Sequence, residues 1–517
     1  MSIAKGLKSQ QSSSRSGYNG AGASVREESG FAESRTNARE RRRLAIAANS
    51  QTAQSVNDVH SQLNETRVGG IVEPNSVAAL QALMRQARDA GRAVSVAGGR
   101  HAMGGQQFAG GGLLVDMRRM NRVLSFDPSR FEIEVEAGIQ WPELINFMVE
   151  SQRGLETQQA SIMQKQTGAD NLTIGGALAA NIHGRGLNLK PFINDVESFV
   201  LVGAEGDARV CSRLENQELF RLAIGGYGLF GIIASVRLRL ARRRKLERVA
   251  EIITTREVMS AFDGRIRDGF LYGDFQFATD GDSTDFLRKG VFSCYRPVAD
   301  DAPMPDEEVE LCAEDWQQLY YLAHVNRRRA FEVYSKHYLA TSGQLYWSDT
   351  HQLSVYLDDY HRQLDLRLGV QQVRATEMIT EVYVPRAALA DFLERVRRDF
   401  RRYAVDLIYG TVRLIKRDDE SFLAWAEKDY ACIVFNLHTE HSAVGLAKAQ
   451  EDFRRLIARA IEFGGSYYLT YHRWATREQV ELCYPQLPEF LRLKRHYDPA
   501  ETLQSDWYRH YKKMFCA

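Results

Sequence analysis

Three glycine-rich loops are the parts of this sequence whose composition and spacing point most directly to chemistry. They cover residues 97–105 (AGGRHAMGG), 173–184 (TIGGALAANIHG) and 225–231 (GGYGLFG). Glycine lets the backbone adopt positive φ and approach a ligand closely, and successive exposed N–H groups form a concavity that binds phosphate. Each loop alone is more typical of an ordinary turn than of a ligand site. Three such loops, each near an apolar segment, favour a bound nucleotide.

The third loop also matches the dinucleotide fingerprint G-x-G-x-x-G, at Gly226, Gly228 and Gly231. That fingerprint requires a strand before it and a helix after it, so that the helix N-terminus meets the pyrophosphate. Here helical spacing over 218–223 comes first and strict alternation over 232–240 comes afterwards. The reversed order argues against a Rossmann NAD site.

The elements that position these loops follow from hydrophobic periodicity. Residues 77–87 have helical spacing, with Pro74 and Ser76 as a start signal and Gly91 as a stop signal. Short strands are predicted at 94–97, 113–116, 131–136 and 232–240. Interleaved strands and helices predict an α+β or α/β domain over residues 56–240. A further helix is predicted at 443–463, ended by two glycines.

Composition and charge bound the remaining possibilities. The chain has 517 residues, of which 44% are hydrophobic, and this suggests two to four domains. A net charge of +1 argues against a nucleic-acid-binding protein. Six well-separated cysteines indicate reduced thiols. Because there is no transmembrane-length apolar run and no secretory signal, we expect a cytoplasmic protein.

The three loops, in this order, resemble the FAD-binding domain of the vanillyl alcohol oxidase (PCMH-type) superfamily. The subgroup most similar is that of the decaprenylphosphoryl-ribose oxidases, with features of alditol and aldonolactone oxidases. The resemblance rests on the segments 111–117 (GGLLVDM), 174–179 (IGGALA), 182–184 (IHG), 228–233 (GLFGII), 462–465 (EFGG), 484–485 (YP) and 498–506. It covers residues 56–240 and 430–517 well and the middle of the chain poorly.

The resemblance implies an α+β fold, with a two-part FAD-binding domain and a second α+β substrate or cap domain. On this basis we predict an FAD-binding domain at 56–240, a substrate domain at 241–465 and a C-terminal segment, 466–517, that returns to the flavin. Residues 1–55 are rich in Ser, Gly, Asn, Arg and Ala. They are expected to be disordered up to about residue 38, and a short helix could follow over 36–53.

By motif position, the resemblance assigns FAD contacts to the first loop, to the second loop with Gly168 before it, to two isoleucines that follow the third loop and to one C-terminal tyrosine. The residues are Gly98, Gly99, Arg100, His101, Ala102, Gly168, Thr173, Gly175, Gly176, Asn181, His183, Gly184, Ile232, Ile233 and Tyr468.

His101 occupies the position where alditol oxidases carry a histidine bonded to the flavin 8α-methyl. A neutral imidazole can attack that activated carbon, so a covalent FAD is one reading of His101. The other is a histidine that donates a hydrogen bond to phosphate. The second loop has Ala169 and Asp170 where doubly tethered relatives have a cysteine, so we expect a single attachment at most.

The segment 467–474 (YYLTYHRW) resembles the strand that carries a catalytic lysine in decaprenylphosphoryl-ribose oxidases. Tyr471 stands at the lysine position and His472 follows it, so either residue is a candidate base for the substrate hydroxyl proton. The alternative is an aromatic strand packed in a core. If the segment is a strand, the two side chains point to opposite faces.

Further candidates lie on predicted strands of the middle region. Arg413 matches an arginine near the flavin in alditol and aldonolactone oxidases and would hold substrate or the flavin N1–C2 carbonyl region. An exposed charged strand explains it equally well. Gln276 and Glu381 could face the substrate, although surface alternation accounts for them too. The pair His438-x-x-His441 has metal-like spacing without an evident third ligand. We therefore interpret it as a loop pair and predict no metal site.

The resemblance predicts an FAD-dependent oxidase or dehydrogenase that oxidises a CH–OH group of a sugar, polyol, lactone or related small molecule by hydride transfer to flavin N5. Oxygen or an electron carrier would be the acceptor, and the oligomeric state is left open. The alternatives are a flavoenzyme of another reaction type (C–N oxidation, oxidative cyclisation or C=C reduction) and a noncatalytic flavoprotein.

Overall fold

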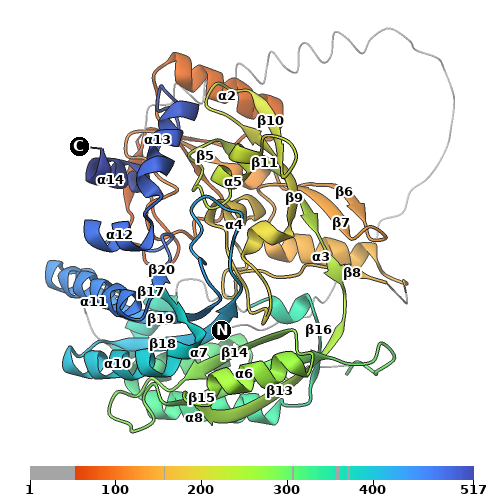
Figure 1. Cartoon of the computed structure of the whole chain (residues 1–517), viewed down its shortest axis with the longest axis vertical. Helices are drawn as coiled ribbons and strands as arrows, with labels where there is room; N and C mark the ends of the chain where they lie inside the picture. Colours follow the sequence, from red (N-terminus) through yellow and green to blue (C-terminus); the bar gives the residue numbers. More distant parts are fainter. Residues whose placement is uncertain (1–52, 156–157, 306–307, 355–359, 370–372, 517) are drawn as a thin grey trace.

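The computed structural model describes residues 53–155, 158–305, 308–354, 360–369 and 373–516 (Figure 1). The N-terminal segment expected to be disordered, with its short helix, lies outside these ranges except for its last three residues. Within the described residues, no helix is long and apolar enough to cross a membrane. The six cysteines lie in the described residues and form no disulfide there.

A small parallel sheet near the start of the described residues carries the first glycine loop. Its strand order is β3-β5-β4. Helix α2 (Val77–Asp89) connects the first two of these strands in sequence, and the Ser76 side chain accepts a hydrogen bond from the Ala79 N–H at its start. This N-cap is the one predicted from the sequence. The strands are β3 (Gly70–Val72), β4 (Val94–Ala97) and β5 (Leu113–Asp116).

A five-stranded antiparallel sheet follows, in the order β10-β9-β11-β7-β6. Helix α4 (Ile174–Ala180) packs on strand β11 and carries the second loop. Helix α5 (Gln217–Ala223) precedes the third loop and β11 follows it, so the order is helix, loop, strand as the sequence predicted. The strands are β6 (Val123–Asp127), β7 (Glu132–Glu136), β9 (Val196–Val202), β10 (Ala208–Ser212) and β11 (Ile232–Arg239).

The middle of the chain forms an eight-stranded antiparallel sheet, ordered β16-β13-β15-β14-β18-β19-β17-β20. Its strands are β13 (Lys245–Thr254), β14 (Tyr272–Phe277), β15 (Lys289–Pro297), β16 (Leu345–Trp347), β17 (Ala375–Pro385), β18 (Leu407–Ile415), β19 (Tyr430–Glu440) and β20 (Ser466–Tyr467). The helices that accompany it are α6 (Val258–Arg267), α7 (Ala313–Val325), α8 (Arg327–Ala340), α9 (Tyr360–Leu368), α10 (Leu389–Arg402) and α11 (Ala443–Glu462). Figure 1 shows this sheet below the glycine-loop half of the molecule.

The C-terminal segment returns to the first half of the chain. After β20 it forms α12 (Arg477–Cys483), α13 (Leu487–Tyr497) and α14 (Asp506–Phe515), and Leu503 makes a parallel bridge to Val94 of β4. In Figure 1 these dark blue helices lie beside the orange N-terminal strands.

The strand predicted over 467–474 is wrong beyond its first residue. Strand β20 ends at Tyr467, and residues 469–474 form turns. The Leu469 carbonyl accepts hydrogen bonds from the side chains of Gln106 (2.9 Å) and Trp507 (3.2 Å) instead of from a neighbouring strand. Tertiary contacts therefore override the β-propensity of this aromatic run.

Candidate active site

The three glycine loops converge on one cavity, here called the glycine-loop cavity, of about 1230 Å³ including its mouth. Most of the predicted FAD-contacting residues line it. They are Gly98, Gly99, Arg100, His101, Ala102, Gly168, Thr173, Gly175, Gly176, Ile233 and Tyr468. Its walls are mainly apolar, as is usual for a cofactor site with a few placed polar groups.

Close packing between the loops explains why glycine is needed there. A Cβ at Gly98 would overlap Thr173 Oγ1, and one at Gly99 would overlap the Asn171 carbonyl. In the third loop Gly228 has φ +75° and a Cβ there would meet Val96. These side-chain-free walls leave backbone facing the cavity, so the residues present fit a ligand that carries phosphates.

Four predicted cofactor residues lie outside this cavity. Ile232 points into the core shared with α2, because it neighbours Ile233 on a strand and adjacent side chains face opposite sides. The Gly184 N–H donates to Gln164 Oε1 (3.2 Å). Asn181 Nδ2 donates to Asp418 Oδ2 (2.9 Å), while its Oδ1 accepts from the Ile193 N–H (2.9 Å).

The fourth of these residues, His183, is fully buried against a carboxylate. Its Nε2 lies 2.6 Å from Glu381 Oε1, and its Nδ1 lies 3.1 Å from the Gly184 carbonyl. Asn181, His183 and Gly184 thus belong to a loop that reaches the cavity, but these three residues bond to neighbouring protein groups.

His101 lines the glycine-loop cavity beside a histidine that the sequence did not single out. His60 Nε2 lies 2.8 Å from His101 Nδ1. Burial, followed by the charge of His60, holds the pKa of His101 well below its ordinary value. The imidazole is therefore neutral near pH 7, which is the form able to act as a nucleophile. His60 lies 41 residues before His101 in the sequence and outside the glycine loops, so no motif of the sequence marks it.

A second cavity of about 1520 Å³, here called the sheet cavity, lies against the eight-stranded sheet. Its walls come from β14, β17, β18, β19, α7 and α8. Polar side chains in these walls include Gln276, Tyr409, Asn436, Glu377 and Arg413. The two cavities share His60, Gln166, Thr167, Gly168, Ile379 and Tyr471. These shared residues define the junction between the two spaces.

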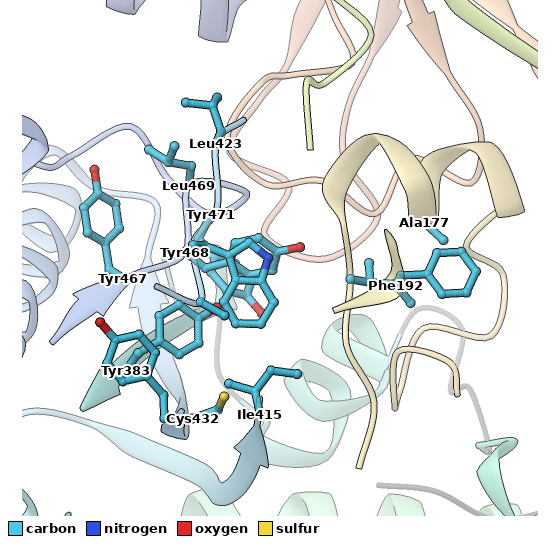
Figure 2. Close-up of a cluster of buried hydrophobic side chains, with 14 of the residues drawn as sticks. Ala177, Phe192, Tyr383, Ile415, Leu423, Cys432, Tyr467, Tyr468, Leu469 and Tyr471 are labelled. Atoms are coloured by element: carbon cyan, nitrogen blue, oxygen red, sulfur yellow. The ribbon is translucent and has the colours of Figure 1, made fainter. Parts of the chain in front are cut away.

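Tyr471 carries the only hydroxyl group of a tyrosine among the described residues that line both cavities. That hydroxyl donates to Glu381 Oε2 (3.2 Å), and the opposite carboxylate oxygen faces His183. Tyr471 also packs beside Tyr468, with ring centroids 5.7 Å apart, in the aromatic cluster of Figure 2. Tyr471 therefore connects the junction to a buried carboxylate and imidazole that line neither cavity.

Burial sets the protonation of Tyr471 and Glu381. Burial, followed by the charge of Glu381, raises the pKa of Tyr471 well above its ordinary value. Burial also opposes ionisation of Glu381, but the contact with His183 outweighs it and holds the pKa of Glu381 below its ordinary value. The phenol is thus protonated and the carboxylate ionised near pH 7, so Glu381 can accept a proton through Tyr471.

Arg413 extends from β18 into the sheet cavity and is 4% exposed. Its Nε and Nη1 have no hydrogen-bond partner among the described residues. A buried guanidinium with donors left over is costly unless a ligand completes its hydrogen bonds. The exposed-strand alternative for Arg413 is therefore wrong.

His472 is not part of the junction. It is buried outside both cavities, and its ring stacks on Trp474 with centroids 4.5 Å apart. Burial lowers its pKa to about 4. Because residues 469–474 do not form a strand, the strand alternation expected for Tyr471 and His472 does not apply. Of the two, only Tyr471 lines the cavities.

The fold and the glycine-loop cavity together define a class of flavoprotein. Residues 68–212 match the family model of an FAD binding domain, and the chain is similar to FAD-dependent oxidoreductases of the vanillyl alcohol oxidase (PCMH-type) superfamily.

Among curated proteins, the chain is 24% identical over 445 residues to decaprenylphosphoryl-beta-D-ribose oxidase of Mycolicibacterium smegmatis, covering 83% of this chain and 91% of that protein. It is 28% identical over 279 residues to an uncharacterized oxidoreductase, ORF5 in the fasciation locus of Rhodococcoides fascians, covering 52% of this chain and 60% of that protein. L-gulonolactone oxidase of Mus musculus is 26% identical over 195 residues, which are 38% of this chain and 42% of the relative.

Proposed function

We propose that this protein uses FAD to oxidise a CH–OH group of a sugar, polyol, lactone or related small molecule. The observation that carries the proposal is the Tyr471 hydroxyl at the junction of the glycine-loop cavity and the sheet cavity. FAD held by the glycine loops would accept the hydride from the substrate carbon, and oxygen or an electron carrier would reoxidise it. The amide, phenol and carboxylate groups in the sheet cavity suit a hydroxylated substrate.

In this proposal the chain's own residues move the proton and place the charge. The Tyr471 hydroxyl accepts the substrate hydroxyl proton while its own proton passes to Glu381, 3.2 Å away. Arg413 binds the substrate or the flavin N1–C2 carbonyl region and supplies the positive charge that favours reduction. Residues 241–465, which supply most of the sheet cavity, would act as the substrate domain.

Anaerobic bleaching of the bound flavin tests the reaction class. At least one member of a panel of sugars, polyols and lactones should bleach the visible absorbance of the flavin, with amines as the contrast. Bleaching by amines alone would move the reaction to C–N oxidation. If no member of either group reduces the flavin, the proposed reaction is wrong.

We also propose that His101 is bonded covalently to the FAD. Its neutral state in the cavity wall and its contact with His60 support this role. Wild-type protein precipitated with acid should retain its flavin, whereas His101→Ala should release it and keep the fold. Free FAD in the supernatant of the wild-type protein would show that His101 only neighbours the cofactor.

A further inference from the structure

A cluster of three histidines surrounds Glu377 in the wall of the sheet cavity. His324 Nε2 lies 2.9 Å from Glu377 Oε1, and His438 Nδ1 lies 3.6 Å from the same oxygen. His361 Nε2 lies 3.4 Å from the other oxygen, Oε2. Glu377 is 2% exposed and His324 7% exposed. These two side chains are nearly removed from water, whereas His361 (12% exposed) and His438 (22% exposed) lie towards the edge of the cluster.

Four separate elements bring these side chains together. Glu377 on β17 and His438 on β19 are direct cross-strand neighbours in an antiparallel pair. His324 comes from the last turn of α7, and His361 from α9. Of His438 and His441, which have metal-like spacing in the sequence, only His438 belongs to the cluster. His441 Nε2 instead lies 2.9 Å from Thr376 Oγ1.

The hydrogen bonds of His324 fix its tautomer. Its Nδ1 lies 2.9 Å from the Tyr320 carbonyl, which can only accept, so Nδ1 carries a proton. In the neutral ring, Nε2 then presents its lone pair to a carboxylate oxygen at 2.9 Å. Two electron-rich atoms at this distance require a positive charge between them, supplied by a proton or by a metal ion.

The arrangement of the imidazoles suits a metal ion. At Glu381 one imidazole faces the carboxylate, so one shared proton satisfies the pair. At Glu377 three imidazole nitrogens face one carboxylate, and the tautomer of His324 leaves the lone pair of its Nε2 directed towards it. A divalent cation accepts lone pairs from neutral imidazoles and from a carboxylate at one centre. A hydrogen bond from the opposite ring nitrogen to a carbonyl, as in His324, is the usual support of a metal-bound histidine.

We propose that His324, Glu377 and His438, with His361 beside them, bind a divalent transition metal of the Zn²⁺ class. Zn–N distances of about 2.0–2.1 Å place tetrahedral ligand atoms about 3.3 Å apart. The distances from Glu377 to the three nitrogens, 2.9, 3.4 and 3.6 Å, bracket that separation. Nitrogen and carboxylate ligands suit Zn²⁺ and its first-row neighbours rather than Ca²⁺ or Mg²⁺.

The metal would connect α7 and α9 to β17 and β19 where α7 forms part of the sheet cavity wall. Leu319, Tyr320 and Ala323 of α7 line that cavity, as does Glu377 itself. The site would therefore hold the outer wall of the cavity in place. It does not depend on the reaction proposed above, and its test needs no substrate.

Metal content and thermal stability test the site in the untagged full-length flavoprotein. After incubation with Zn²⁺ and removal of excess, the wild type should retain about one Zn²⁺ per chain, and EDTA should lower its melting temperature reversibly. His324→Gln, His438→Gln and Glu377→Gln should weaken Zn²⁺ binding by more than the about 10- to 100-fold that loss of an outer-shell partner costs. His496→Gln removes an exposed histidine on α13 and should behave as the wild type.

Two results would overturn the proposal. One is a wild-type protein that retains no Zn²⁺ and whose melting temperature responds neither to Zn²⁺ nor to EDTA. The other is unchanged Zn²⁺ retention in the three cluster variants, since the ion would then lie elsewhere. Anomalous diffraction at the zinc absorption edge provides a check that does not rely on variants. It should place the ion between His324 Nε2 and His438 Nδ1.

Discussion

At the scale of single residues, burial decides which polar side chains can react. Tyr471 and His472 are neighbours in sequence and both are buried. Tyr471 reaches the junction of the two cavities and has Glu381 as a proton acceptor, whereas His472 is stacked on Trp474. A protonated phenol is a poor base by itself, so the relay to Glu381 is what makes Tyr471 useful.

Replacing Tyr471 with Phe should slow anaerobic flavin reduction by about 10²- to 10⁴-fold, the usual contribution of a positioned proton acceptor. The ring and its packing beside Tyr468 stay, so flavin content should not change. Stopped-flow absorbance measures both quantities. His472→Gln is the matched control and should alter the rate only slightly. The opposite ranking of the two variants would return the base role to His472.

Asp195 provides a pH-dependent stability prediction. Burial raises the pKa of Asp195 to about 7, although Gln164 Nε2 donates to its Oδ2 at 3.1 Å. Because the folded pKa lies above the unfolded value near 3.8, this residue's stabilising contribution is complete below about pH 4. It is lost by about 1.4 kcal/mol per pH unit as the pH rises towards 7.

Asp195→Asn should remove that dependence because the amide cannot ionise. The melting temperature of the variant relative to the wild type should therefore be higher at pH 8 than at pH 5. Thermal melts at the two pH values measure this difference. An equal difference at both pH values would mean that Asp195 ionises freely in the folded protein.

At the scale of elements, the loops between strands and helices form the cavity, and the regular elements only bring them together. The first loop follows β4 and the second leads into α4, and the two meet where Gly98 packs on Thr173. Thr173 is also the N-cap of α4, with Oγ1 accepting from the Gly176 N–H at 3.2 Å. A side chain at Gly98 would push this cap away from its helix.

Gly98→Ala should therefore lower the flavin content of the purified protein, because the added Cβ would overlap Thr173 Oγ1. The ratio of flavin to protein absorbance measures the loss. Gly281→Ala is the control, since a Cβ there has nothing within 4 Å. Full flavin content in Gly98→Ala would show that the two loops can separate without disturbing the cofactor site.

At the scale of the whole molecule, the C-terminal return completes the site that the first half begins. Trp507 on α14 is fully buried, its ring centroid lies 5.0 Å from that of Tyr227, and its Nε1 donates to the Leu469 carbonyl. Tyr227 lines the glycine-loop cavity. One C-terminal side chain thus supports both the third loop and the turn that presents Tyr471.

Trp507→Ala should cost about 3–5 kcal/mol of stability, as is usual when a large buried aromatic side chain is removed. It should also lower flavin content, because the cavity wall at Tyr227 loses its support. Thermal melts and the flavin-to-protein ratio report the two effects. Trp316→Ala removes a comparably buried tryptophan from the separate cluster beside α7 and α8, and should lower stability while keeping the flavin. Equal flavin loss in both variants would make the effect one of general destabilisation.

Tertiary structure alone determined which residues meet at the two sites proposed here. Glu377 and its three histidines come from four elements, and no local pattern records that β17 and β19 place Glu377 opposite His438. The turn at 469–474 depends on Gln106 and Trp507, which are far from it in sequence. Such contacts depend on packing between distant segments, and periodicity describes only neighbours along the chain.

The sequence by itself determined the features that depend on local geometry. Helical spacing and a serine cap predicted α2, and alternation predicted β7 and β11. The glycines marked the backbone that lines the cavity, because positive φ and close approach are properties of a residue and its immediate neighbours. Periodicity also predicted the helix-loop-strand order around Gly226–Gly231. That order excludes a Rossmann site, which requires a strand before the glycines and a helix after them.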